Sequence, residues 1–329
     1  MEKRQEHWGG LAAGFFFLSS MGAMMFVIIG MLDFANSLLA QIVGGWLALA
    51  ACVIIGIGGV MLFAELGNKG KAYMLHKPCI MLLGAACMAV CAGCALVYAS
   101  FFIELPWSDL AWLRRVVAVV GMLAGLVLVL YPGPEMGEAC GRPFWRAGGL
   151  MLLFLVTAST IGLAAILLFG SICATDTLFG DATLFVALLE YLSLDFLRTL
   201  FTGALVVEAI AIFIYLLAVK GSHPAATYAV NNIMKGDYKI AFWGGVIVIG
   251  IAIPLVLMLL PAIPGLVMLA CFCAIIGGAF LRAIILFAGV RVVLPGEENE
   301  FIEQDEISEL AVYFNKRWDE KAKWLSGRP

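Results

Sequence analysis

Long apolar runs alternate with short polar segments along almost the whole chain. Each run is close to the roughly 20 residues that a helix needs to cross a hydrocarbon core about 30 Å thick. Lipid offers the backbone no hydrogen-bond partners, so continuous runs of this length predict membrane-spanning helices rather than the alternating strands of a barrel. The eight runs are residues 9–32, 38–64, 79–101, 110–131, 146–169, 194–219, 240–260 and 265–290.

The composition supports the same fold class. Hydrophobic residues make up 63% of the 329 positions and charged residues 13%, whereas a soluble domain carries about 25% charged residues. We therefore predict an all-α polytopic membrane protein, surrounded by lipid and without a nucleic-acid partner. Lys3 and Arg4 precede the first run, but no small-residue cleavage site follows it, so we expect a permanent span.

The basic residues are distributed unequally between the two ends of the predicted spans. Eight spans place both termini on one side. Of the 20 Lys and Arg residues, only Arg114, Arg115 and Arg198 fall on the opposite side, and Arg282 lies inside the last run. The positive-inside rule then predicts that both termini are cytoplasmic.

The C-terminal segment differs from the apolar runs. In EISELAVYFNKRWDEKAKWL, residues 306–325, the apolar side chains recur at helical spacing, with acids early and Lys/Arg late. This pattern predicts an amphipathic helix that lies on the membrane surface or docks on a partner.

Several chemistries are disfavoured by the sequence. His7, His76 and His223 all lie at or beyond the ends of apolar runs, so we expect no intramembrane haem. Cys91 and Cys94 form one CxxC pair without a second pair, and cysteine as a small apolar filler is the favoured interpretation. We predict no metal bound by this chain.

Two charged residues lie inside apolar runs. Glu208 is in the sixth run and Arg282 in the eighth. A charge in lipid costs at least ~2.5–3.5 kcal/mol on insertion scales, so both are candidates for function. Two interpretations stay open: a structural ion pair between them, and a proton path or the inner wall of a ligand site.

A second polar group gathers at the predicted cytoplasmic ends of the spans. Its centre is the polar island YPGPEMGEACGRPFW, residues 131–145, between the fourth and fifth runs. Glu135 and Glu138 are interpreted as solvated loop charges. A tyrosine at the membrane boundary is either an interfacial anchor or a hydrogen-bond donor to a ligand at that depth. The members are His7, Glu65, His76, Tyr131, Glu135, Glu138 and Arg142.

Several of these stretches resemble the membrane-subunit family of polysulfide reductase, of the NrfD/PsrC type. Their order and the number of spans both agree with that family. The similar stretches are GGLAAGFFFLSSMG (9–22), AELGNKGKAYML (64–75), the polar island followed by LMLLFLVTASTIG (150–162), FWGGVIVIGIAIP (242–254) and the last span from Gly277 to Gly289.

The resemblance implies a role in electron transfer. Members of that family are membrane subunits of respiratory oxidoreductases in the prokaryotic inner membrane, without haem. They bind a quinone, commonly menaquinone, and exchange electrons with a ferredoxin-like [4Fe–4S] subunit that connects to a catalytic, often molybdopterin, subunit. The implied fold is two four-helix bundles, residues 1–132 and 133–291, followed by the tail 292–329.

The resemblance also implies roles for individual residues. Tyr131 matches the tyrosine that reaches the quinone head group, and Arg142 matches the arginine of an Arg-Pro pair. Glu65 occupies the position of an acid that would accept a proton, with His7 or His76 as less favoured bases. The best-known relatives place their catalytic subunits outside the cytoplasm, against the charge distribution of this chain.

Two other functions are considered. A secondary transporter would need broken helices around a midplane cavity, and Pro254 is the only proline well inside a run. A passive anchor would keep the fold without the quinone site. Asn68 and Lys69 replace the family's Arg-Pro. The first run also starts too late to supply the Asn and His that some members offer to the quinone, which favours this alternative slightly.

Overall fold

The computed structural model describes residues 8–65, 80–103, 105–138, 142–146, 148–175, 194–261 and 263–290. His7, His76 and the predicted amphipathic tail lie outside these residues. Residues 1–291 form one compact unit, and residues 292–329 form a second. The helices are α1 (Gly10–Phe34), α2 (Leu38–Glu65), α3 (Ile80–Ser100), α4 (Ala111–Leu130), α5 (Pro132–Glu138), α6 (Leu150–Thr175), α8 (Leu194–Lys220), α9 (Pro224–Met234), η3 (Ala241–Ala252), α10 (Ile253–Leu259) and α11 (Pro264–Phe287).

Every predicted apolar run is helical, which confirms the all-α polytopic fold. Eight helical segments of the described chain are long and apolar enough to cross a membrane. The chain is therefore a multi-pass membrane protein. The segments are Gly10–Phe34, Leu39–Glu65, Ile80–Ser100, Ala111–Glu138, Leu150–Gly170, Phe196–Lys220, Ala241–Leu259 and Gly265–Phe287.

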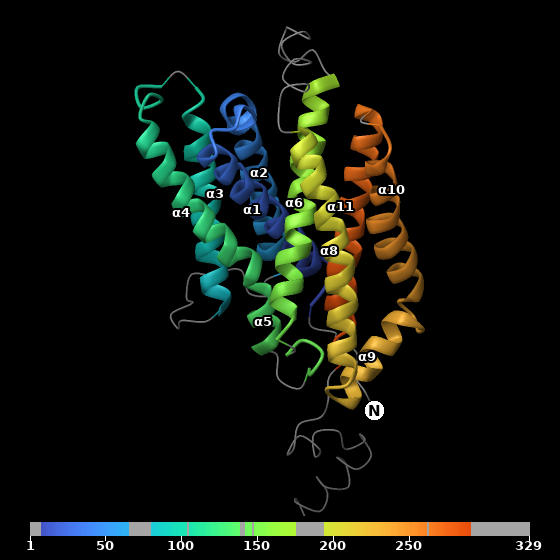
Figure 1. The fold of residues 1–329 in the computed structure, drawn as a ribbon. Coiled ribbons are helices and arrows are strands. Elements are labelled where there is room, and N and C mark those ends of the chain that lie inside the picture. Colours follow the sequence, from blue (N-terminus) through green and yellow to red (C-terminus); the bar gives the residue numbers. More distant parts are fainter. Residues whose placement is uncertain are drawn as a thin grey trace, which may run out of the picture. The chain divides into compact units, whose positions relative to one another are not determined.

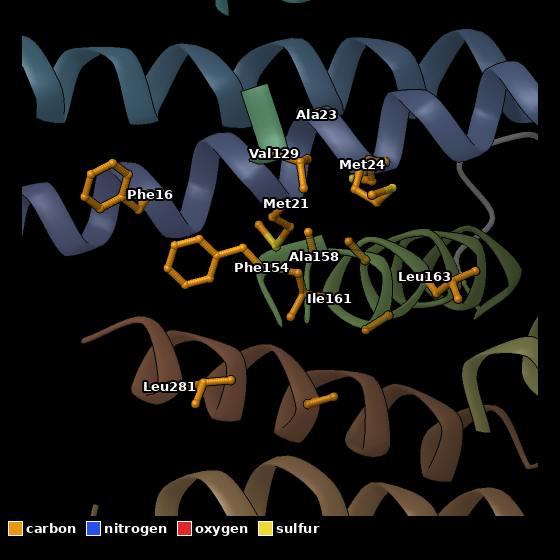
Figure 2. Close-up of a cluster of buried hydrophobic side chains, with 14 of the residues drawn as sticks. Phe16, Met21, Ala23, Met24, Val129, Phe154, Ala158, Ile161, Leu163 and Leu281 are labelled. Atoms are coloured by element: carbon orange, nitrogen blue, oxygen red, sulfur yellow. The ribbon is translucent and has the colours of Figure 1, made fainter. Parts of the chain in front are cut away.

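Helix α1 is the most buried span. It is apolar on all sides, as expected for a helix with protein on every face. It contacts α2, α4, α6 and α11 (Figure 1). Figure 2 shows Met21 and Met24 of α1 packed beside Ala158 and Ile161 of α6, with Leu281 of α11 beyond them. Such interdigitation supplies the dispersion energy that holds spans together where no water can drive association.

Glycines allow two of these helix pairs to approach closely. A Cβ atom added at Gly22 of α1 would come within 2.8 Å of the Ala51 carbonyl oxygen of α2. A Cβ added at Gly277 of α11 would come within 2.1 Å of the Gly250 Cα in η3. In both places the added Cβ atom would collide with the backbone of the neighbouring helix, so only glycine fits at Gly22 and Gly277.

Two of the segments between predicted spans, which were expected to be loops, contain short helices. The first part of the polar island forms α5, because Tyr131 stays in the right-handed helical region and the Glu135 N–H donates to its carbonyl at 3.2 Å. Pro132 is tolerated there, since the first position of a helix needs no N–H. The segment 220–239 contains α9, whose N-terminus is capped by the His223 imidazole.

The seventh span changes its winding. It begins as the π-helix η3 and continues from Ile253 as the α-helix α10. Pro254 at this junction has no N–H to donate, so the ladder of backbone hydrogen bonds changes there. Gly250, one turn earlier, lies against α11.

The division into two bundles stays a prediction. Helices α1 to α4 contact one another, and so do α6, α8, η3, α10 and α11. However, α1 also packs against α6 and α11, so one continuous core joins the two sets.

The start of α1 and the end of α11 lie at the same end of the unit. The Trp145 indole N–H donates to the Ile285 carbonyl oxygen at 2.9 Å, and its ring centroid is 5.9 Å from that of Trp8. This agrees with an even number of crossings. Which side of the membrane this end faces remains the prediction from the charge distribution.

At the other end of the unit, a buried ion pair joins the end of α1 to the start of α4. Arg114 donates to both carboxylate oxygens of Asp33, at 2.8 and 3.2 Å, and Asp33 is only 1% exposed. The Tyr98 hydroxyl of α3 is buried close enough to interact with the same carboxylate, without a hydrogen bond among the described residues, and the Arg114 guanidinium lies 5.6 Å from the Phe102 ring centroid.

We predict that Asp33→Asn destabilises the protein by about 3 kcal/mol, because it leaves the Arg114 charge without its buried partner. Thermal unfolding of the purified protein in detergent measures the change. Asp109→Asn, an exposed acid at the same end, is the control and should unfold like the wild type. Equal unfolding midpoints for both variants would contradict this role for Asp33.

Candidate functional site

A cavity of about 220 Å³ lies at the end of the unit where α1 begins. Aromatic and aliphatic side chains dominate its wall, and two carboxylates provide most of its polar character. An apolar pocket with few, fixed polar groups is the usual form of a small-molecule site, although drug-sized pockets begin at roughly 300 Å³. The cavity therefore suits part of a larger molecule. Its lining residues are Trp8, Ala12, Phe15, Phe16, Leu62, Glu65, Met81 and Glu135.

Glu65, the last residue of α2, is fixed against the start of α1. Its Oε1 atom accepts a hydrogen bond of 2.6 Å from the Gly9 N–H. Gly9 is the residue before α1 and has no capping side chain of its own. A carboxylate at a helix N-terminus also interacts favourably with the helix dipole. Glu65 therefore has a structural role as well as a position on the cavity wall.

Tyr131 stands beside the cavity rather than among its lining residues. Its ring is 3% exposed and packs against the rings of Phe15 and Phe16, both at 6.4 Å between centroids. Its hydroxyl interacts favourably with the Glu135 carboxylate, whose Oε2 atom accepts no hydrogen bond from the described residues. The resemblance implies that Tyr131 donates directly to a quinone head group, and this stays a prediction.

Glu135 is the residue that the sequence analysis misjudged as a solvated charge. It lies on α5, one turn after Tyr131, so its side chain returns to the same side of the chain as the tyrosine. It is partly buried, its Oε2 atom is shielded from solvent, and it lines the cavity. The only signal in the sequence is the spacing of four residues from Tyr131, which matters only if the Pro-Gly-Pro segment is helical.

Arg142 does not line the cavity. The Trp145 ring lies between its guanidinium and Trp8, which does line it. The Arg142 guanidinium lies 4.6 Å from the Trp145 ring centroid. Trp145 contacts Trp8, whose ring is 5.4 Å from that of Phe16 on the cavity wall. The Tyr215 hydroxyl donates to the Phe144 carbonyl oxygen at 2.7 Å, which attaches this segment to α8.

Glu208 and Arg282 lie away from the cavity wall, buried between helices. Glu208 is in hydrogen-bonding range of the Thr160 hydroxyl of α6. The Arg282 guanidinium donates to the Phe154 carbonyl oxygen at 3.1 Å and lies 4.0 Å from the Phe154 ring centroid. The two charges attract each other, but they do not form a direct ion pair within the described chain. Both sequence interpretations of this pair remain open.

Metal ligation has no support from the described residues. Among them, no three His, Cys, Asp or Glu side chains lie close enough together to hold a metal ion.

These observations define a polytopic membrane protein with a mainly apolar, carboxylate-containing cavity at the end of its spans. The family described as polysulphide reductase, NrfD, matches residues 2–294, and the chain belongs to this family. Members of the family are membrane subunits of respiratory oxidoreductases, interact with quinones, and usually pair with iron–sulfur and catalytic subunits. Comparison with curated proteins finds no match for the chain.

We predict that Gly84→Ala displaces the Tyr131 ring and costs about 1–3 kcal/mol of stability, as overpacking does. A Cβ atom at Gly84 of α3 would lie 2.4 Å from the Tyr131 Cε2 atom. Thermal unfolding in detergent measures the loss. Gly93→Ala is the matched control on the same helix, since nothing lies within 4 Å of its Cβ position. An unfolding midpoint for Gly84→Ala equal to that of Gly93→Ala would contradict the tight packing.

We also predict that Glu208→Ala and Arg282→Ala each destabilise the protein by about 1–3 kcal/mol, since each leaves a buried polar group without a favourable neighbour. The double variant should lose less than the two single variants added together. A double-mutant cycle on thermal unfolding measures the coupling. Strict additivity would show that the two charges do not stabilise each other.

Proposed function

We propose that this chain is the quinone-interacting membrane subunit of a respiratory oxidoreductase complex and that the cavity between Glu65 and Glu135 receives the quinone head group. The observation that carries this proposal is the position of two carboxylates, those of Glu65 and Glu135, on the wall of one apolar cavity at the end of the spans, with the Tyr131 ring packed against Phe15 of that wall.

The residues present fit such a ligand. Phe15 and Phe16 offer ring surfaces for a flat aromatic head group such as that of menaquinone. The two carboxylates accept hydrogen bonds from the hydroxyl groups of a quinol. The cavity is too small for an isoprenoid tail as well, so the tail extends into lipid while the head group occupies the cavity.

A bound quinol supplies two electrons and two protons. Glu65 is our acceptor for one proton, and the Gly9 N–H holds its carboxylate in place for this transfer. Tyr131 keeps the opposite wall polar through its contact with Glu135. Arg142 and Trp145 hold the polar island against Trp8 at the rim. His7 and His76 remain reserve bases in this proposal.

The electrons leave to a partner on the same end of the molecule. We propose a ferredoxin-like subunit with [4Fe–4S] clusters, connected to a catalytic subunit that contains molybdopterin. The Lys and Arg residues concentrated at this end suit both a cytoplasmic orientation in a prokaryotic inner membrane and a negatively charged partner.

The test measures menaquinol oxidation by the intact complex with Glu65→Gln and Tyr131→Phe. We expect Glu65→Gln to lower kcat by about 10²-fold, the scale of general-base catalysis. Tyr131→Phe loses one hydrogen bond and should lower kcat by about tenfold. Glu138→Gln, an exposed acid on α5, is the control and should turn over normally.

Unchanged rates in both variants, with the iron–sulfur subunit still co-purifying, would favour the passive anchor. Purification of the chain with no iron–sulfur subunit would instead favour a transporter.

A further inference from the structure

Quinol oxidation releases two protons, and the proposed function above accounts for the first acceptor only. Glu65 holds one position on the cavity wall, bonded to the backbone at Gly9. A second group that touches the ligand must take the other proton, because charge separation inside an apolar pocket is costly. Tyr131 does not line the cavity, so its own oxygen is not the first choice.

Glu135 meets the requirements for this second acceptor. Its carboxylate lines the cavity, and one of its oxygens, Oε2, is shielded from solvent. The Tyr131 hydroxyl interacts favourably with the carboxylate, and Gly84 leaves the tyrosine ring the space that it occupies. Glu138, three residues later, is exposed and interacts with Glu135 only through its charge.

We propose that Glu135 is a catalytic residue that accepts the second proton of the quinol and that Tyr131 acts through it as a positioning residue. This inference rests on the proposed function. In the balanced reaction, the two O–H bonds of the quinol break, and one proton goes to each carboxylate, Glu65 and Glu135. The two electrons pass one at a time to an iron–sulfur cluster of the partner subunit, and the cluster passes the first electron on to the catalytic subunit before it accepts the second.

The two carboxylates have different surroundings, which suits an ordered release. Glu65 sits at the junction of α1 and α2, and its hydrogen bond also holds the start of α1 in place. Glu135 is on the short helix α5, and its carboxylate interacts with the buried Tyr131 side chain. Protonation of Glu65 therefore acts on a hydrogen bond that holds α1, whereas protonation of Glu135 acts on its interaction with Tyr131.

The experiment uses the purified complex with all its subunits and compares Glu135→Gln, Glu135→Asp and the control Glu138→Gln. Three quantities are measured: kcat and KM for menaquinol, the equilibrium affinity for oxidised menaquinone, and the carboxylic-acid C=O band in redox-difference infrared spectra. Thermal unfolding midpoints are recorded for every variant.

We expect Glu135→Gln to lower kcat by about 10²-fold or more, the scale expected for loss of a general base. Its quinone affinity and unfolding midpoint should stay near those of the wild type, because the amide keeps the shape and the contact with Tyr131. The infrared band should lose its Glu135 component in Glu135→Gln, leaving that of Glu65, and the Glu135 component should shift in Glu135→Asp. Glu135→Asp should recover part of kcat, and Glu138→Gln should match the wild type in every measurement.

The proposal is overturned if Glu135→Gln turns over at the wild-type rate or keeps the full infrared band. If Glu135→Gln unfolds, the decision falls to Glu135→Asp: an unshifted band in a stable Glu135→Asp complex overturns the proposal as well. Failure of the proposed function gives a different result, because the wild-type complex would then neither bind menaquinone nor oxidise menaquinol.

Discussion

The absence of water around the spans is the constraint on which the rest of this structure depends. A polar group in hydrocarbon must find its partner inside the protein or move to the boundary. The buried charges follow the first course: Asp33 is paired with Arg114, and Arg282 donates to the Phe154 carbonyl oxygen. Glu65 and Glu135 follow the second course and lie at the ends of spans.

The same constraint explains why the cavity lies at the start of α1. Along most of its length α1 is enclosed by other helices, and its side chains fill the space between them. At its first turn the N–H groups have no partners within the helix, and Glu65 must come from α2 to satisfy one of them. The Glu65 carboxylate therefore both lines the cavity and satisfies an N–H group at the start of α1.

The sequence alone predicts the membrane-spanning helices but not the geometry of the site. Apolar length alone predicts a membrane helix, because lipid permits few other structures. Whether Glu135 faces water or a cavity depends on the helical winding of the residues after Pro132, and two prolines and a glycine make that winding improbable from sequence alone. Tyr131 and Glu65 could be selected through the resemblance, but the contact between Tyr131 and Glu135 depends on space left by Gly84, on another helix.

The contacts of Trp145 extend from the cavity wall to the end of α11. Trp145 belongs to the segment that follows α5, accepts the stacked guanidinium of Arg142, and contacts Trp8. Trp8 is itself part of the cavity wall. The indole N–H of Trp145 is bonded to the end of α11, so this ring joins the cavity to the second set of helices. The two sets of helices otherwise meet mainly through α1, so Trp145 is a second connection between the cavity wall and α11.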